Sequence, residues 1–231
     1  MAATARRAVG SRRGRATARA AVPDALPDAT GAADADLAAA PAPVQERLLA
    51  AASRLFAERG FALTSVQEIV EYAGVTKGAM YHYFTSKDDL LQQIYTRLLA
   101  VQSVRLVAIA DDVERPVRDR LRDAAADVVV STLEHLDDAM VSWRSMHMLP
   151  ADRLAAVRAD RRRYHERFRA LIEQGQAEGS LRSDVSPDLA THQFFGGVHH
   201  LGSWYHADGE LTPESIGATF ADLLLRGLEP S

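Results

Sequence analysis

A short stretch around residue 80 combines hydroxyl, cationic, small and aromatic side chains of the kinds that contact DNA. The residues that we expect to face outward there are Thr76, Lys77, Gly78, Ala79, Tyr81 and His82. The ammonium of Lys77 can bind guanine or phosphate, and the methyl group of Ala79 can contact thymine. The polar tips of Tyr81 and His82 can reach phosphate oxygens. This stretch therefore indicates a DNA-reading surface; the alternative is an ordinary helical hairpin with a polar face.

Two short helices joined by a tight turn must position these side chains. Residues 64–67 and 65–68 each have the spacing of a capping box, so a helix should begin there. Gly74 can adopt the left-handed backbone angles that end this helix. Thr76 can cap a second helix that runs to about His82. This order predicts a helix-turn-helix, whose second helix can lie in the major groove of DNA.

Three motifs extend this pattern along the chain. They are AASRLFAERGF at residues 51–61, TSVQEIVEYAGVTKGAMYHYF at 64–84, and SKDDLL at 86–91. Together they make residues 44–99 closely resemble the DNA-binding domain of the TetR family of bacterial transcription regulators.

The resemblance implies a three-helix DNA-binding domain over residues 44–99, with the helix-turn-helix motif at 65–84. Lys87 stands where such proteins carry a phosphate-contacting lysine. We add Thr64 and Ser65, at the start of the motif, to the expected DNA contacts. The expected partner is a double-stranded operator of near-palindromic sequence, since a dimer presents two such helices. A repressor is the expected role, and an activator or an effector-independent DNA-binding protein is the alternative.

Composition limits the other possibilities. The 231 residues are 47% hydrophobic and carry a formal net charge of −4, so they can bury a core, but overall charge does not indicate a nucleic-acid partner. Cysteine is absent, which excludes disulfides and suits a reducing cytoplasm. We find no apolar run of about 20 residues and no signal peptide, so we expect a cytoplasmic protein without a membrane partner.

Residues 1–43 are rich in alanine, arginine, proline and aspartate, with few bulky apolar side chains. Such a segment buries too little surface to offset its ordering entropy, so we predict that it is disordered. Its arginines precede its acids. It could serve as a basic arm that contacts DNA, or it could be a solvated tail or the product of a start codon placed too early.

The remaining chain, residues 100–231, should be an effector-binding and dimerisation domain in an all-α protein of about nine helices. Signals for helix starts occur at Ser86, Pro116, Ser186 and Thr212. The helix that follows Ser186 should reach about residue 205. No strand-like alternation occurs in the sequence.

The last two helices are unusually apolar. The side chains that we expect at a two-fold interface between subunits are Phe194, Val198, Leu201, Ile216, Phe220, Leu223 and Leu224. The alternative is the core of a single subunit. A homodimer is mostly implied by the family resemblance.

Methionine and aromatic side chains in the second half could line a pocket for a small apolar effector. The candidates are Met140, Trp143, Met146, Tyr164, Phe168, Phe195 and His199. The alternative is again an ordinary core.

Residues 161–190, with Trp204-Tyr205 before GELTPESI, also resemble loosely the effector domains of family members that sense acyl-CoA thioesters. This resemblance would assign Arg161 and Arg162 to the CoA phosphates, because guanidinium groups suit phosphate oxygens. The alternative for the arginines in this region is a solvated helix face paired with acids.

No catalytic or metal site is expected. His192, His199 and His206 are seven residues apart, and about 10 Å of helical rise between successive ligands is too far for one ion. We find no GxSxG motif and no phosphate loop, so we expect no enzyme and no cofactor.

Overall fold

The computed structural model describes residues 42–230, and this range contains helices and no strand. The helices are α1 Val44–Arg59, α2 Val66–Tyr72, α3 Lys77–Tyr83, α4 Lys87–Ala110, α5 Val117–Glu134, α6 Leu136–Ser145, α7 Ala151–Ala177, α8 Pro187–His199 and α9 Pro213–Gly227, with the short 3-10 helices η1 Met146–Met148 and η2 Leu201–Ser203. The all-α prediction is confirmed for this range. The prediction of disorder for residues 1–43 falls almost entirely outside it.

The helix starts follow the predicted capping residues. Ser65 caps α2 in a capping box with Glu68, and its neighbour Thr64 does not take part. Thr76, Ser86, Ser186 and Thr212 each accept a backbone N–H with their side-chain oxygen at the start of α3, α4, α8 and α9. Local sequence therefore sets where these helices begin.

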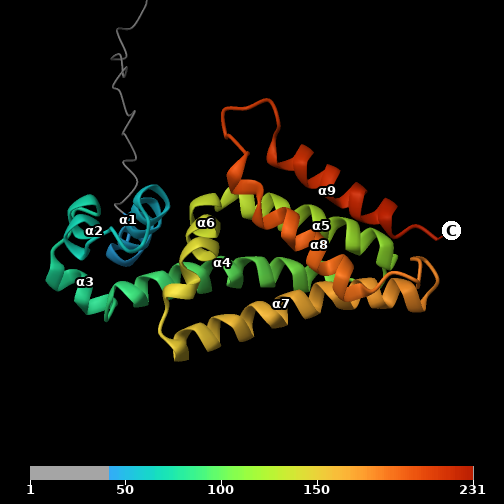
Figure 1. Cartoon of the computed structure of the whole chain (residues 1–231), viewed down its shortest axis with the longest axis horizontal. Coiled ribbons are helices and arrows are strands. Elements are labelled where there is room, and N and C mark those ends of the chain that lie inside the picture. The colour runs from blue at the N-terminus through green and yellow to red at the C-terminus, as the bar shows by residue number, and fades with distance from the viewer. Residues whose placement is uncertain (1–41, 231) are drawn as a thin grey trace, which may run out of the picture. The chain divides into compact units, whose positions relative to one another are not determined.

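Helices α1, α2 and α3 pack against one another at the start of α4 (Figure 1). Ile69 of α2, Met80 of α3 and Phe84 are almost completely buried there. Gly74 ends α2 with φ 63°, a left-handed angle that favours glycine. The buried side of α3 thus fixes which of its side chains remain outside.

Helix α4 connects this unit to the rest of the chain. It contacts α1, α5, α6 and α7, and it runs without interruption past residue 99. The proposed boundary at residue 99 therefore lies inside one continuous helix.

Helices α5 and α9 lie side by side, and α7 and α8 complete the second half (Figure 1). Gly217 allows the close approach of α9, because a Cβ there would lie 2.9 Å from the carbonyl oxygen of Ala126. The predicted helix from 187 to about 205 is too long, since α8 ends at His199 and η2 follows. Gly196 and Gly197 are poor helix formers, and the helix ends soon after them. The backbone N–H of His200 donates to the Gly197 carbonyl oxygen at 3.1 Å, which forms a 3-10 turn at this end.

Candidate DNA-binding surface and effector chamber

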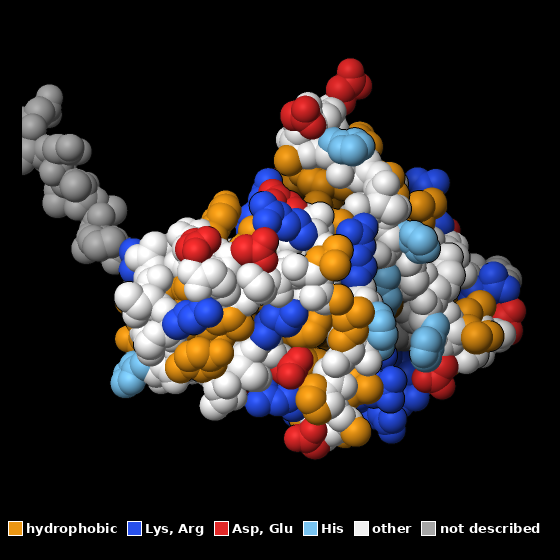
Figure 2. All heavy atoms as spheres, turned by 60° about the vertical axis from the view of Figure 1, so that its left-hand side comes forward, with side chains coloured by type: hydrophobic (Ala, Val, Ile, Leu, Met, Phe, Trp, Pro, Cys, Tyr) orange, Lys and Arg blue, Asp and Glu red, His pale blue; other side chains and the backbone are white. Residues whose placement is uncertain are grey.

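The outward side of α3 carries the predicted DNA-contact residues. Lys77, Gly78, Tyr81 and His82 are exposed, and Tyr81 keeps 55% of its surface accessible. Thr76 caps the helix, because its Oγ1 accepts the backbone N–H of Ala79 at 3.1 Å. In the view that brings this end of the molecule forward, hydrophobic side chains lie beside Lys and Arg side chains (Figure 2). The helix therefore presents a mixed cationic and aromatic surface of the kind that can contact bases and phosphates.

Thr64 does not belong to this surface, and its prediction as a DNA contact is wrong. Its side chain is buried, and its Oγ1 donates to the carbonyl oxygens of Gly60 at 2.9 Å and Leu55 at 3.3 Å. The hydroxyl therefore closes the end of α1. Ser65, in contrast, is exposed at the start of α2 and stays a predicted contact.

Lys87 also has a structural role that the sequence did not reveal. Its Nζ donates to the carbonyl oxygens of Phe61 at 2.8 Å and Thr64 at 2.9 Å, and lies 4.4 Å from the centre of the Phe61 ring. Two of its three N–H groups are thus committed inside the protein. The ammonium ties the start of α4 to the loop between α1 and α2, and Lys87 stays a predicted phosphate contact through its remaining N–H group.

Sequence reasoning missed two exposed tyrosines near this surface. Tyr83, the last residue of α3, is 46% exposed and its ring lies 4.9 Å from that of His82. Tyr72, at the end of α2, is 62% exposed. A tyrosine at a helix end gives no periodic signal, although its polar tip could have been weighed as a phosphate contact.

A small chamber of about 40 Å³ lies among α4, α5, α6, α7 and α8. Its lining residues are Tyr95, Leu98, Leu99, Gln102, Val128, Thr132, Ser142, Trp143, Arg161, Tyr164, His165, Phe195, Val198 and His199. Of the predicted pocket residues, Trp143, Tyr164, Phe195 and His199 are brought together here. The polar groups from α4, α5 and α6 were missed, because each is an isolated polar residue on an otherwise apolar face.

Three predicted pocket residues lie elsewhere, so their assignment is wrong. Phe168 is completely buried and stacks on Phe194 with ring centres 4.9 Å apart. Met140 packs beside Gly202, where a Cβ would lie 2.6 Å from the Met140 Cγ. Met146 is buried in the core and does not border the chamber. These side chains pack between helices and do not line the chamber.

Two histidines of the chamber are held in the neutral form. Burial first, and then the charge of Arg161, lowers the pKa of His165 to about 4 and that of His199 to about 4. His165 stacks on Phe195 at 3.9 Å, and His199 lies 4.8 Å from the ring of Trp143. Neutral imidazoles can each donate and accept one hydrogen bond.

A second cavity of about 320 Å³ opens between α7 and α8, and we call it the arginine cleft. It is lined by Arg158, Arg161, Arg162, His165, Glu166, Arg169, Asp188, Thr191 and His192. Arg161 and His165 line both the arginine cleft and the chamber, so they stand between the two. The cationic cleft and the chamber are therefore neighbours, separated by these two side chains.

The cations of the arginine cleft differ in how they are paired. Arg169 pairs with Asp188 at 3.0 Å, whereas no acid within residues 42–230 forms an ion pair with Arg158, Arg161 or Arg162. The hydroxyl of Thr191 is buried and lacks a partner within the same range. The alternative of a face neutralised by acids therefore does not describe these three arginines.

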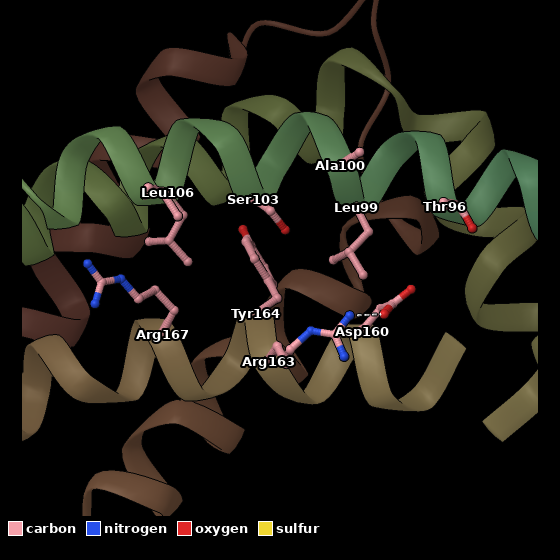
Figure 3. Close-up of a pocket in the computed structure, with 10 residues that line it drawn as sticks. Thr96, Leu99, Ala100, Ser103, Leu106, Asp160, Arg163, Tyr164 and Arg167 are labelled. Atoms are coloured by element: carbon pink, nitrogen blue, oxygen red, sulfur yellow. Dashed lines mark hydrogen bonds and ion pairs between the residues drawn. The ribbon is translucent and has the colours of Figure 1, made fainter. Parts of the chain in front are cut away.

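On its other side α7 faces α4 across a groove of about 440 Å³ (Figure 3). Arg163 pairs with Asp160 there, and Arg167 pairs with Asp111. Tyr164 points from α7 toward α4, with its hydroxyl directed toward Ser103. Tyr164 borders both this groove and the chamber, so its ring forms part of the wall between them.

A hydrogen-bond chain connects the chamber to the DNA-binding half. The Oγ of Ser142, which lines the chamber, donates to the carbonyl oxygen of Asp138 at 2.6 Å. The buried carboxylate of Asp138 accepts from the Ser53 hydroxyl of α1 and from Arg97 of α4 at 2.7 Å. Helix α6 is therefore held to both α1 and α4 through a single side chain.

The predicted interface residues divide between core and surface. Val198, Leu201 and Ile216 are buried within the subunit, whereas Phe194 and Leu224 are mostly buried but line the groove between α8 and α9. Leu223 is 66% exposed and Leu189 on α8 is 70% exposed. A shallow groove of about 130 Å³ between α8 and α9 includes Phe220 and Leu223. The apolar surface open to a partner is thus smaller than the sequence predicted.

Within residues 42–230, no group of three or more His, Asp or Glu side chains is placed to hold a metal ion. Among the helices of this range, none combines the length and the low polarity that a membrane span requires.

Two family models match the chain. The model described as "Bacterial regulatory proteins, tetR family" matches residues 48–94, and the one described as "Tetracyclin repressor-like, C-terminal domain" matches residues 114–228. The HTH-type transcriptional repressor KstR2 of Mycolicibacterium smegmatis is 24% identical over 197 residues, which cover 85% of this chain and 96% of that protein.

Solved structures share the fold. PfmR, a TetR family transcriptional regulator from Thermus thermophilus, has a TM-score of 0.73 and 27% identity, covering 80% of this chain and 100% of its own. AibR in complex with isovaleryl coenzyme A and operator DNA has a TM-score of 0.69 and 24% identity, covering 81% of this chain and 99% of its own.

Proposed function

This chain belongs to the TetR family of DNA-binding transcriptional regulators, and we propose that it is a cytoplasmic homodimeric repressor released from its operator by an acyl thioester of coenzyme A. The family acts by binding operator DNA and an effector, and we propose no catalytic step for this chain. The exposed side of α3, centred on Lys77 and Tyr81, would contact the operator.

The observation that carries the effector proposal is that the arginine cleft adjoins the chamber, with Arg161 and His165 lining both. Coenzyme A is an anionic ligand whose phosphates need cationic donors, and the guanidinium groups of Arg158, Arg161 and Arg162 form no ion pair with any acid of residues 42–230. The thioester end would pass between Arg161 and His165 into the chamber. AibR shares this fold and was solved with isovaleryl coenzyme A, so the fold can accommodate this class of ligand.

The dimer would form through α8 and α9. Leu189 and Leu223 are large apolar side chains that remain exposed on these helices, and Phe220 is only partly buried. Burying them against a second copy removes apolar surface from water. A two-fold dimer also places two copies of α3 to read a near-palindromic operator.

Release would follow from a shift of α6. A ligand in the chamber contacts Ser142 and Trp143, one turn along α6 from Asp138. Because Asp138 is bonded to α1 and α4, a displacement of α6 changes how the DNA-binding helices are held. The effector needs to favour the displaced state by differential binding for this to end DNA binding.

The test is a mobility-shift assay with the DNA upstream of the gene, titrated with acyl-CoA thioesters. We expect the double substitution Arg161→Ala, Arg162→Ala to raise the thioester concentration needed for release at least about tenfold, since two charge-assisted contacts are lost. DNA binding without effector should be unchanged. The matched control is Arg163→Ala, Arg167→Ala, on the opposite side of α7 and paired with acids. Equal release curves for the two double variants would contradict the arginine cleft as the site.

A further inference from the structure

The lining of the chamber combines apolar side chains with hydroxyl, amide and imidazole groups that could hydrogen-bond a ligand. We infer that the acyl group entering it is short and carries a neutral oxygen function, a hydroxyl or a keto group. This inference rests on the proposed function, because it concerns the acyl end of the proposed thioester.

The first argument is an unused hydrogen-bond donor. The Oγ1 of Thr132 accepts from the amide nitrogen of Gln102 at 3.1 Å, and this amide also donates to Ser131 at 3.2 Å. No acceptor within residues 42–230 takes the hydroxyl proton of Thr132, which is 2% exposed. A buried hydroxyl proton without an acceptor is unfavourable, so a ligand oxygen beside Thr132 would satisfy it.

The second argument is the absence of acid among the lining residues. The chamber is bordered by hydroxyl, amide and imidazole groups, and Arg161 is its one permanently charged residue. Because Arg161 also lines the arginine cleft, its charge lies at the entrance and is available to the thioester or phosphates. His165 and His199 are neutral, in agreement with a neutral ligand group deeper inside.

The third argument is size. The volume of about 40 Å³ holds only about three water-sized groups. This is enough for the end of an acyl group of about four carbons, and too little for a fused ring system or a long chain. Phe195 borders the chamber on the α8 side and Trp143 borders it on the α6 side.

The central comparison in the experiment is between butyryl-CoA and 3-hydroxybutyryl-CoA, which differ by one hydroxyl group. Binding of butyryl-CoA, both enantiomers of 3-hydroxybutyryl-CoA, octanoyl-CoA and CoA itself is measured by titration calorimetry on the full-length protein. We expect one 3-hydroxybutyryl enantiomer to bind at least about tenfold more tightly than butyryl-CoA, since sites built to hydrogen-bond a hydroxyl discriminate strongly against its absence. Octanoyl-CoA should bind more weakly than both.

The variant Thr132→Val should remove the preference and bring the affinity ratio of the pair close to one. Its affinity for butyryl-CoA should be kept, which separates loss of a hydrogen bond from loss of the fold. If butyryl-CoA or octanoyl-CoA binds as tightly as the tighter-binding 3-hydroxybutyryl enantiomer, the inference is overturned and the proposed function stands. If no thioester binds and none releases DNA, both fall.

Discussion

The exposed side of α3 and the effector chamber hold their polar side chains in different ways. On α3, Lys77, Tyr81 and His82 project from one short helix into solvent, and only a cap and a buried Met80 are needed to aim them. In the chamber, the lining side chains come from five helices, and Gln102 is hydrogen-bonded to Thr132. Substitutions on the DNA surface should therefore leave the stability of the fold unchanged, whereas substitutions in the chamber should lower it. This separation can be tested by variants that affect one region and leave the other unchanged.

The largest effect is expected on α3. Replacing both Lys77 and Tyr81 with alanine removes a cation and a phenol from the surface that faces the operator. We expect operator affinity to fall on the order of 100-fold, because each base or phosphate contact contributes about 1–3 kcal/mol. The melting temperature and thioester binding should stay as in the parent protein. Val104→Ala, which changes an exposed residue of α4, is the control and should keep full operator affinity.

The connection between the two regions should respond to Asp138→Asn. The carboxylate holds α6 to Ser53 and Arg97, and an amide cannot accept both bonds with the same charge assistance. We expect thioester binding and operator binding, each measured alone, to persist, while the thioester loses most of its effect on operator affinity, a change of about tenfold. Asp137→Asn is the matched control, since Asp137 is the preceding residue and its one ion pair within residues 42–230 is with Arg54 at 3.5 Å. Undiminished release by the Asp138 variant would show that coupling takes another route.

A smaller effect, confined to stability, is expected at Thr64. Thr64→Val keeps the shape of the side chain but removes the bonds to Gly60 and Leu55, so the unfolding free energy should fall by about 1–2 kcal/mol. Operator affinity of the folded variant should not change. Denaturant unfolding measures the stability of the variant, and a mobility-shift assay on the same preparation measures its operator affinity. A loss of operator affinity without a loss of stability would restore Thr64 as a DNA contact.

The sequence predicted the helices well because their start signals are local. Ser65, Thr76 and Thr212 cap the helices that they were expected to cap, since a cap depends only on the next few residues. The end of α8 was placed about six residues too far along, because two glycines in an otherwise apolar helix give a weak signal.

The sites were harder to predict because the partners of a side chain come from distant helices. Thr64 and Lys87 looked like surface groups, but each finds backbone carbonyls that the sequence does not place beside it. Arg161 and Arg163 are the same residue type and lie on the same helix, α7. Arg163 nevertheless pairs with an acid, whereas Arg161 lines a cavity. The periodicity of a sequence shows which residues share a side of a helix. It does not show which side lines a cavity and which side lies beside an acidic side chain.

The last and smallest effect concerns pH. His165 has a folded-state pKa of about 4, below the ordinary value of 6.5, so between these values the unfolded chain binds more protons than the folded one. Stability should therefore fall as the pH is lowered through this window and be level above it. His165→Gln removes one such group and should reduce the slope by up to about 1.4 kcal/mol per pH unit. Urea unfolding at several pH values between 4.5 and 7 measures this slope. An unchanged slope in the variant would mean that His165 has the same pKa in the folded and unfolded states. His165 would then no longer support the inference that the chamber holds neutral imidazoles.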